Sequence, residues 1–241
     1  MPKNNGTGIL YIIATPIGNY EDITLRAIRL LNEVDIIICE ETRQATTLFK
    51  KINITPQSLV SLTEHNEKKD AGEFLQHFFL GKNIALISDC GTPVFSDPGR
   101  ILIETCISNG IRVVPVPGAS SLMATLSSLD FPIDQFFFAG FLPRESGQRD
   151  QAISRLKTYT CPIVLMDTPY RLGKCLEEME KAFGKNTRAT LACDLTLPTE
   201  SIIRDSLQNI KKKVGARKAE FLLVILPPRS NRPDKKTGKF H

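Results

Sequence analysis

Residues 84–99, Ile-Ala-Leu-Ile-Ser-Asp-Cys-Gly-Thr-Pro-Val-Phe-Ser-Asp-Pro-Gly, join a short apolar run directly to a loop rich in glycine and proline. The first four residues have the length and composition of a strand buried in a sheet, and the loop residues exclude a regular continuation. Asp97 and Pro98 have the order of an N-cap and a first helical proline, which predicts a helix over 99–109. Ligands of open α/β sheets bind outside the carboxyl ends of the strands, where such a loop lies. The stretch therefore predicts a small-molecule site at residues 89–95.

Short apolar runs alternate with amphipathic segments through the whole first half of the chain. Strands are predicted at 9–14, 34–39, 84–87 and 111–116, and helices at 24–31, 44–51, 70–79 and 99–109. A further short apolar run lies at 59–62. This alternation is typical of a mostly parallel sheet with helices on its faces. Pro115-Val-Pro-Gly118 interrupts it, and a different pattern follows. We therefore predict two α/β domains, residues 1–116 and 117–228, and a basic flexible tail at 229–241.

The formal charge of +5 is concentrated near the C-terminus. Residues 228–241 carry a net +4, so the rest of the chain is nearly neutral. Such a tail is either a solvated segment or an electrostatic arm for a nucleic acid, and the sequence leaves both open. No apolar run approaches the roughly 18 residues that span a bilayer, and the N-terminal residues do not resemble an export signal. We expect a cytoplasmic protein that is not associated with a membrane.

Several common catalytic motifs are absent from the sequence. It contains no Walker loop, no Gly-x-Gly-x-x-Gly after a strand and no Gly-x-Ser-x-Gly elbow. The cysteines are scattered singly, as expected of buried thiols in a reducing compartment, and the histidines lack metal-ligand spacing. These absences argue against ordinary nucleotide-binding folds, hydrolases and metalloenzymes, and no metal site is expected.

Three tight loops remain as candidates for ligand binding, and each follows a predicted strand. They are Pro16-Ile-Gly18, Asp89-Cys-Gly-Thr-Pro93 and Pro117-Gly-Ala-Ser-Ser121. Small residues let the backbone approach a ligand closely, and prolines reduce the entropy that a loop loses on binding. One such loop alone is more often an ordinary strand-to-helix turn, but three together indicate a binding site.

A series of short motifs carries a resemblance to a known family. In order, the motifs are Ala14-Thr-Pro-Ile-Gly-Asn19, Glu41-Thr-Arg43, Glu64-His-Asn-Glu67, Ser88-Asp-Cys-Gly-Thr-Pro93 with Ser96-Asp-Pro-Gly99, Pro115-Val-Pro-Gly118, Gly140-Phe-Leu-Pro143 and Thr168-Pro-Tyr-Arg-Leu172. The series resembles the tetrapyrrole methylase superfamily of S-adenosylmethionine-dependent methyltransferases. Within it, the chain is most similar to the bacterial subfamily that methylates a ribose 2′-hydroxyl of small-subunit ribosomal RNA.

The resemblance implies an α/β fold class with two domains and a homodimeric protein. In this tetrapyrrole-methylase-like fold, the N-terminal domain has a mostly parallel sheet and the C-terminal domain a mixed sheet. S-adenosyl-L-methionine is expected between the domains, and the small ribosomal subunit or its RNA is the expected partner. The cofactor contacts implied residue by residue are Pro16, Gly18, Asp89, Cys90, Gly91, Thr92, Phe95, Ser120, Ser121, Met166, Ala192 and Leu195. Asp89 is equally well explained as a residue that caps its own loop.

The acceptor decides what else the chemistry requires. Methyl transfer from a sulfonium needs no metal, because the cofactor provides the leaving group and the protein aligns the reactants. A ribose hydroxyl benefits from a general base, for which the candidates are His65, Glu40 and Glu41. A carbon acceptor on a tetrapyrrole would need less. The candidate substrate contacts are Arg43, Arg144, Arg149, Tyr170 and Arg171. The guanidinium groups of the arginines suit RNA phosphates or tetrapyrrole carboxylates, and Arg144 and Arg149 are equally well explained as residues of a solvated surface.

Three segments depart from the usual residues of the ribosomal subfamily. Glu40-Glu41 stands where that subfamily usually has Glu-Asp before Thr-Arg. Asp167-Thr-Pro-Tyr-Arg171 stands where that subfamily tends to have Glu-Ser-Pro-His-Arg, and Cys193-Asp-Leu-Thr-Leu197 replaces Arg-Glu-Leu-Thr-Lys. The departures leave the acceptor open. We predict a ribosomal RNA ribose 2′-O-methyltransferase. The alternatives are a methylase of a tetrapyrrole or other small molecule, and a non-catalytic protein that binds S-adenosylmethionine or RNA.

Overall fold

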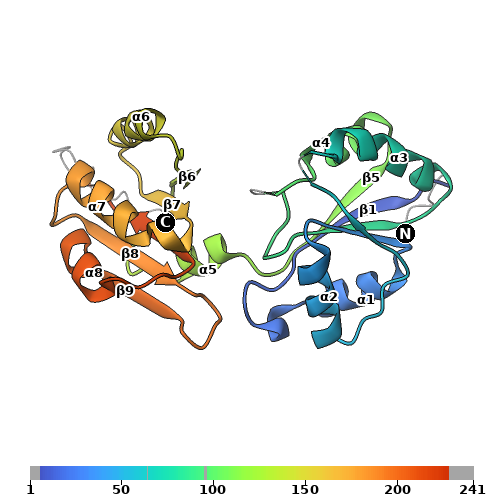
Figure 1. The fold of residues 1–241 in the computed structure, drawn as a ribbon, viewed down its shortest axis with the longest axis horizontal. Helices are drawn as coiled ribbons and strands as arrows, with labels where there is room; N and C mark the ends of the chain where they lie inside the picture. Colours follow the sequence, from blue (N-terminus) through green and yellow to red (C-terminus); the bar gives the residue numbers. More distant parts are fainter. Residues whose placement is uncertain (1–5, 64, 95–96, 228–241) are drawn as a thin grey trace, which may run out of the picture. The chain divides into compact units, whose positions relative to one another are not determined.

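The computed structural model of the chain describes residues 6–63, 65–94 and 97–227 (Figure 1). Contacts among these residues form two compact units whose boundary falls between Ser121 and Leu122. The sequence places the domain boundary slightly earlier, after residue 116, and the domain limits stay a prediction. Phe95 and the basic tail at 229–241 lie outside the described residues.

The N-terminal unit is built on a five-stranded sheet in the order β3-β2-β4-β1-β5. All of its strand pairs are parallel, as the alternating sequence pattern predicts. The strands are β1 (Ile9–Ile13), β2 (Ile36–Cys39), β3 (Leu59–Ser61), β4 (Ile84–Ile87) and β5 (Arg112–Val116). Because every strand runs in the same direction, the loops that follow the strands all leave the sheet at one edge.

Helices cover both faces of this sheet (Figure 1). Alternate strand residues face opposite sides, so Ile37 and Ile38 enter different hydrophobic clusters. The short helix η1 (Tyr20–Asp22) precedes α1 (Leu25–Glu33), which packs with α2 (Thr42–Lys51) on one face. The other face is covered by α3 (Glu67–Phe79) and α4 (Arg100–Ser108).

The start of α4 differs from the sequence-based prediction. Its N-cap is Gly99, and no local side chain caps the helix. The buried carboxylate of Glu67 takes that role, because its Oε1 accepts hydrogen bonds from the backbone N–H groups of Gly99, Ile101 and Leu102 at 2.9, 2.7 and 3.2 Å. The prediction of Asp97 as the cap was therefore wrong, since the acceptor comes from the preceding helix rather than the adjacent loop.

The C-terminal unit contains a five-stranded sheet in the order β6-β7-β10-β8-β9. Strand β6 pairs parallel to β7, and the remaining pairs are antiparallel, so the sheet is mixed. The strands are β6 (Phe137–Phe141), β7 (Ile163–Asp167), β8 (Arg188–Cys193), β9 (Ser201–Ser206) and β10 (Phe221–Ile225). The predicted α/β class, with a parallel sheet followed by a mixed one, is confirmed.

The two faces of the mixed sheet are covered by different elements (Figure 1). One face packs against α6 (Ser146–Leu156), α7 (Leu172–Phe183) and α8 (Leu207–Val214), with the short helix η2 (Pro169–Arg171) leading into α7. The other face packs against α5 (Ser121–Ser127) and the segment that follows it. No helix among residues 6–63, 65–94 and 97–227 is long and apolar enough to cross a membrane.

Candidate cofactor and substrate site

The three predicted binding loops meet at the carboxyl edge of the parallel sheet. They follow β1, β4 and β5, and β1 lies between the other two strands. The carbonyl oxygen of Gly91 accepts hydrogen bonds from the backbone N–H of Thr15 at 2.8 Å, from the Thr15 hydroxyl at 3.3 Å and from the Ser88 hydroxyl at 2.8 Å. The Thr15 hydroxyl also lies 3.1 Å from the carbonyl oxygen of Ser88. Thr15 and Ser88 are buried, so these bonds fix the loops in place.

Two glycines are required where the loops touch. Gly91 has φ +85°, and a Cβ atom there would lie 3.1 Å from Cγ2 of Ile17. A Cβ on Gly118 would lie 2.9 Å from Cβ of Ala14. The Thr92 hydroxyl completes the contact by donating to the carbonyl oxygen of Ala119 at 3.2 Å. The small residues therefore let the three loops close into one continuous wall.

A hollow of about 160 Å³ opens beside this wall. It is smaller than the roughly 300–1,000 Å³ of pockets that enclose a whole small-molecule ligand, so within this unit it fits only part of one. Four predicted cofactor residues line it together with two polar residues that the sequence prediction missed, Tyr20 and Gln44. The full lining is Thr15, Pro16, Ile17, Gly18, Tyr20, Gln44, Leu48, Asp89 and Cys90. Gln44 directly follows the Glu41-Thr-Arg43 motif, and this position could have identified it from the sequence as a candidate site residue.

Asp89 connects the loop after β4 to the loop after β2. Its Oδ1 accepts a hydrogen bond from the backbone N–H of Glu41 at 3.1 Å. Burial raises the pKa of Asp89 despite that hydrogen bond, and the neighbouring charge of Glu41 raises it further. Burial likewise raises the pKa of Asp97, with a smaller contribution from Asp89. Asp89 therefore caps the loop after β2 rather than its own loop, and it also lines the hollow.

The three candidate bases lie along the same edge of the sheet. Glu40 and Glu41 follow β2, and Glu41 is the N-cap residue of α2. His65 is exposed in the turn between β3 and α3. The two segments are joined because the Ser61 hydroxyl donates to the carbonyl oxygen of Glu40 at 2.7 Å. The structure brings the candidates to one edge without selecting among them.

Cys90 and Arg43 are exposed residues at this edge. The Cys90 thiol lies 3.7 Å from the carbonyl oxygen of Ile17. The expectation of buried thiols was therefore wrong for this cysteine, which sits in the loop rather than in a strand. Arg43 extends from the first turn of α2, a position open to a substrate.

The predicted cofactor residues of the C-terminal unit lie at one end of the mixed sheet. Met166 and Ala192 both pair with Leu222 of the strand between them, so the two residues flank it at the same level. Leu195 follows the end of β8 and is almost fully buried. The backbone after β8 is unusual, because Asp194 and Thr196 adopt φ values of +49° and +66°.

Asp194 holds this segment in its conformation. Its carboxylate accepts a hydrogen bond from the Arg217 guanidinium at 2.7 Å and another from the backbone N–H of Glu220 at 3.1 Å. In return, the Asp194 N–H donates to the carbonyl oxygen of Glu220 at 2.8 Å. The segment 193–197, which departs from the ribosomal subfamily, is thus fixed by contacts to the start of β10.

A basic aromatic surface occupies the same end of the mixed sheet. Tyr170 is 79% exposed, and Nζ of Lys218 lies 4.9 Å from the centre of its ring. Arg171 is partly exposed and lies 4.0 Å from the carboxylate of Asp167. Lys218 was missed because it is adjacent to Tyr170 only in the fold. Arg144 is exposed in the loop before α6.

Arg149 does not belong to this surface. It is only 1% exposed, and its guanidinium donates to Asp167 at 2.9 Å, to Glu178 at 2.8 Å and to the carbonyl oxygens of Pro143 and Leu142 at 3.2 and 3.4 Å. Its donors are taken up inside the unit, so the prediction of a substrate contact was wrong. Arg149 instead ties α6 to β7 and α7 by pairing with two carboxylates, those of Asp167 and Glu178.

Comparison with known proteins agrees with this geometry. The sequence model of the family described as tetrapyrrole (corrin/porphyrin) methylases matches residues 9–211. The chain belongs to this family. Ribosomal RNA small subunit methyltransferase I of Pseudomonas aeruginosa is 41% identical to this methyltransferase over 196 residues, which are 81% of this chain and 69% of that protein. The protein of the same name from Pasteurella multocida is 37% identical over 226 residues, covering 92% of this chain and 80% of its own.

The comparison with solved structures supports the fold. A solved structure of uroporphyrin-III C-methyl transferase from Thermus thermophilus, complexed with S-adenyl homocysteine, matches with a TM-score of 0.63 at 16% identity. The match covers 90% of this methyltransferase and 97% of that chain. The family and the tetrapyrrole-methylase-like fold predicted from the sequence motifs are therefore confirmed.

Proposed function

We propose that this methyltransferase transfers a methyl group from S-adenosylmethionine to a ribose 2′-hydroxyl of small-subunit ribosomal RNA. The observation that carries the proposal is the identity of 37–41% over most of the chain to relatives named ribosomal RNA small subunit methyltransferase I. Homodimerisation and a cytoplasmic location belong to the same proposal. Sedimentation of the purified protein tests the first, since a single monomeric species at micromolar concentration would contradict it.

The loop residues suit the cofactor. Gly91 and Gly118 allow a wall made largely of backbone, whose N–H and C=O groups bind a nucleoside and an amino-acid group without further side chains. The residues that would hold the cofactor are Pro16, Gly18, Asp89, Cys90, Gly91, Thr92, Ser120 and Ser121 in the N-terminal unit, and Met166, Ala192 and Leu195 in the C-terminal unit. When bound, S-adenosylmethionine supplies a methyl group activated by attachment to a sulfonium.

The protein must also accept the proton of the 2′-hydroxyl. Glu40, Glu41 and His65 remain the candidates, and their common edge of the parallel sheet supports a base in this region. A positioned base contributes about 10²- to 10⁴-fold to the rate. We expect one of the variants Glu40→Gln, Glu41→Gln and His65→Gln to lose this factor in kcat while keeping its affinity for S-adenosylmethionine.

The pH dependence identifies the base among these variants. A base acts only when deprotonated, so the wild-type rate rises with pH through the pKa of that group. The variant that lacks the base should lose this rising limb of the profile, whereas a variant that only perturbs packing should keep it. Rates close to wild type in all three variants would remove the catalytic assignments.

The RNA acceptor is supported by the surface around Tyr170. Stacking of an exposed aromatic ring on a base contributes about 1–3 kcal/mol, and Lys218 and Arg171 beside it suit phosphates. Tetrapyrrole carboxylates would also suit the cations, so the acceptor needs a direct test. Ribose methylation should be mapped on ribosomal RNA from a strain lacking the gene. One position should lose its methyl group and regain it with the wild-type gene, and an unchanged map would overturn the acceptor.

Cofactor binding is tested separately by calorimetry. The purified protein should release or absorb heat on titration with S-adenosylmethionine. No heat with millimolar cofactor at two temperatures would contradict the methyl donor itself rather than the acceptor.

A further inference from the structure

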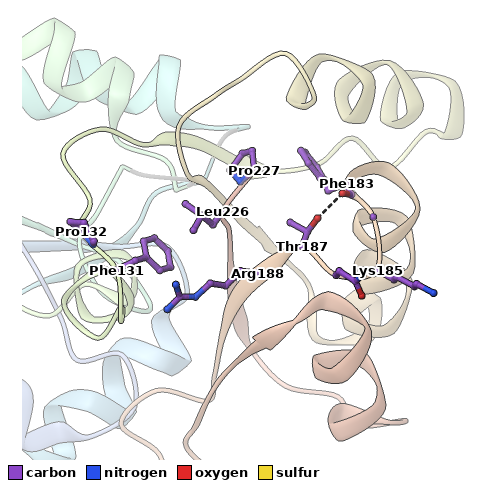
Figure 2. Close-up of a pocket in the computed structure, with 10 residues that line it drawn as sticks. Phe131, Pro132, Phe183, Lys185, Thr187, Arg188, Leu226 and Pro227 are labelled. Carbon is purple, nitrogen blue, oxygen red and sulfur yellow. Dashed lines mark hydrogen bonds between the residues drawn. The ribbon is translucent and has the colours of Figure 1, made fainter. Parts of the chain in front are cut away.

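A second hollow, of about 800 Å³, opens in the C-terminal unit (Figure 2). Arg188, which begins β8, lines this groove, whereas Ala192 and Cys193 at the other end of the same strand lie with the predicted cofactor residues. The groove is therefore separate from the site described above. Its lining is Phe131, Pro132, Phe183, Gly184, Lys185, Asn186, Thr187, Arg188, Leu226 and Pro227, and we call it the Phe131 groove.

Apolar side chains form much of the groove. Phe131 and Phe183 lie on opposite sides of Leu226, and Pro227 lies next to Leu226 (Figure 2). Phe131 packs on the hydrophobic cluster beneath α5, and Phe183 packs on the cluster beneath α7, so both rings have fixed supports. Rings that are held in this way and still border a groove can stack on a flat ligand with little loss of entropy.

Positive charge surrounds these rings. The Arg188 guanidinium lies 5.5 Å from the centre of the Phe131 ring and 2.6 Å from the carboxylate of Asp130. Arg204 donates two hydrogen bonds to the carbonyl oxygen of Ser128, at 3.0 and 2.5 Å. The pKa of Asp130 is lowered mainly by its hydrogen bond from Arg188, with a smaller contribution from the charge of Arg204. One carboxylate thus stands between two guanidinium groups, which leaves this side of the groove cationic.

The opposite side of the groove is cationic as well. Lys185 is exposed and points outward beyond Phe183 (Figure 2). Among residues 6–63, 65–94 and 97–227, no carboxylate forms an ion pair with its ammonium group. Pro227 is the last described residue, and the sequence that follows it, 228–241, carries a net +4. A second copy of this chain seated here would bring like charges together, whereas a polyanion would be attracted.

We propose that the Phe131 groove binds a single-stranded segment of the substrate RNA away from the modified nucleotide. Bases stack on the apolar floor between Phe131 and Phe183, while Lys185 and Arg188 contact phosphates on the two sides. The inference rests on the proposed RNA acceptor, because a small-molecule acceptor would not extend to this end of the sheet. The Phe131 groove would be a second RNA-binding site, in addition to the surface around Tyr170.

Binding of a fluorescent oligouridine of about 12 nucleotides to the full-length protein tests the groove, with anisotropy measured over a series of salt concentrations. Lys185→Gln should weaken binding roughly three- to tenfold and reduce the slope of log K against log[salt] by about 0.7, as expected when one phosphate fewer is neutralised on a single strand. The matched control is Lys157→Gln, which removes an exposed lysine that does not line the groove. It should bind as the wild type does.

Phe131→Leu separates stacking from charge. The variant keeps an apolar side chain on the cluster beneath α5 but removes the ring, so affinity should fall about fivefold or more with no change in the salt slope. Thermal unfolding establishes that the variant remains folded. Wild-type RNA affinity in both Lys185→Gln and Phe131→Leu overturns the proposal. So does a change of oligomeric state on sedimentation without a change in RNA affinity, which would make the groove a subunit interface.

A failure of the groove proposal can be distinguished from a failure of the proposed function. If the methylation map is unchanged but both variants lose RNA affinity, the groove is an RNA-binding site, and the proposed ribosomal ribose acceptor is refuted. If the wild type methylates the RNA and both variants bind RNA normally, only the groove is refuted.

Discussion

At the scale of single residues, Glu67 shows how one buried carboxylate can fix the edge of the parallel sheet that carries the candidate bases. It joins the turn that contains His65 to the start of α4, which follows the loop of Asp89. Glu67→Ala would leave three backbone N–H groups without their acceptor. We expect the free energy of unfolding to fall by about 2 kcal/mol, measured by urea denaturation.

Two other substitutions separate the role of the Glu67 side chain as a hydrogen-bond acceptor from the role of its charge. Glu67→Gln keeps an oxygen that can accept the same hydrogen bonds, so it should lose less than half as much stability as Glu67→Ala. Glu73→Ala removes an exposed carboxylate from the same helix and should stay within about 0.5 kcal/mol of wild type. Equal losses in the Glu67 and Glu73 alanine variants would refute the capping role.

At the scale of elements, the three loops behave as one wall because of Gly91. An alanine at a position with positive φ costs about 1–2 kcal/mol, and Gly91→Ala would in addition press on Ile17. Gly110→Ala is the matched control, since Gly110 has φ +72° but no atom within 4 Å of an added Cβ. Both variants should lose stability in urea denaturation, and the loss should be larger for Gly91→Ala because its new methyl group also presses on Ile17. Only Gly91→Ala should bind S-adenosylmethionine more weakly, by about tenfold in calorimetry.

The same loop region should show a pH effect through Asp97. Burial raises its pKa in the folded protein, so above that pKa the ionised carboxylate opposes folding. The opposition disappears as the pH falls through the folded pKa and then below the unfolded value. Asp97→Asn should therefore be more stable than wild type at pH 7, and the difference should vanish in acid.

Asp205 provides a control of opposite sign. Its pKa is lowered by hydrogen bonds from Lys213, Asn209 and the backbone N–H of Ser206. It therefore stabilises the fold at neutral pH and loses this effect as the pH falls through its folded pKa. Asp205→Asn should be less stable than wild type at pH 7. A loss of stability in both variants at pH 7 would contradict the account of Asp97.

At the scale of the whole molecule, charge is distributed unevenly along the chain. Deletion of residues 228–241 removes a net +4 of the formal +5. If this segment binds RNA, the truncated protein should show weaker oligouridine binding and a smaller salt slope, by about 0.7 for each phosphate that the segment neutralises. Binding of S-adenosylmethionine should be unaffected. An unchanged salt slope would identify the segment as a solvated tail.

The sequence was sufficient for the arrangement of elements because local patterns carry that information. The segment 172–183 has a helical apolar period and forms α7, and the apolar run at 84–87 forms β4. The candidate binding loops could be predicted as well, since proline fixes its own φ and glycine permits backbone conformations closed to other residues wherever they occur. Residues such as Gln44 and Lys218 could not, because their relevance depends on which distant segment they contact.

Arg149 marks the limit of sequence reasoning most clearly. An arginine in a polar segment is usually exposed, but three elements converge on this one and supply two carboxylates and two carbonyl oxygens. The sequence by itself determined the family, the two kinds of sheet and the three tight loops, because the parallel sheet and the loops follow from local patterns and the mixed sheet follows from the family that the ordered motifs indicate. Only the tertiary structure decided which charged residues are buried supports and which stay open to a ligand, because burial and ion pairing depend on contacts between segments far apart in the chain.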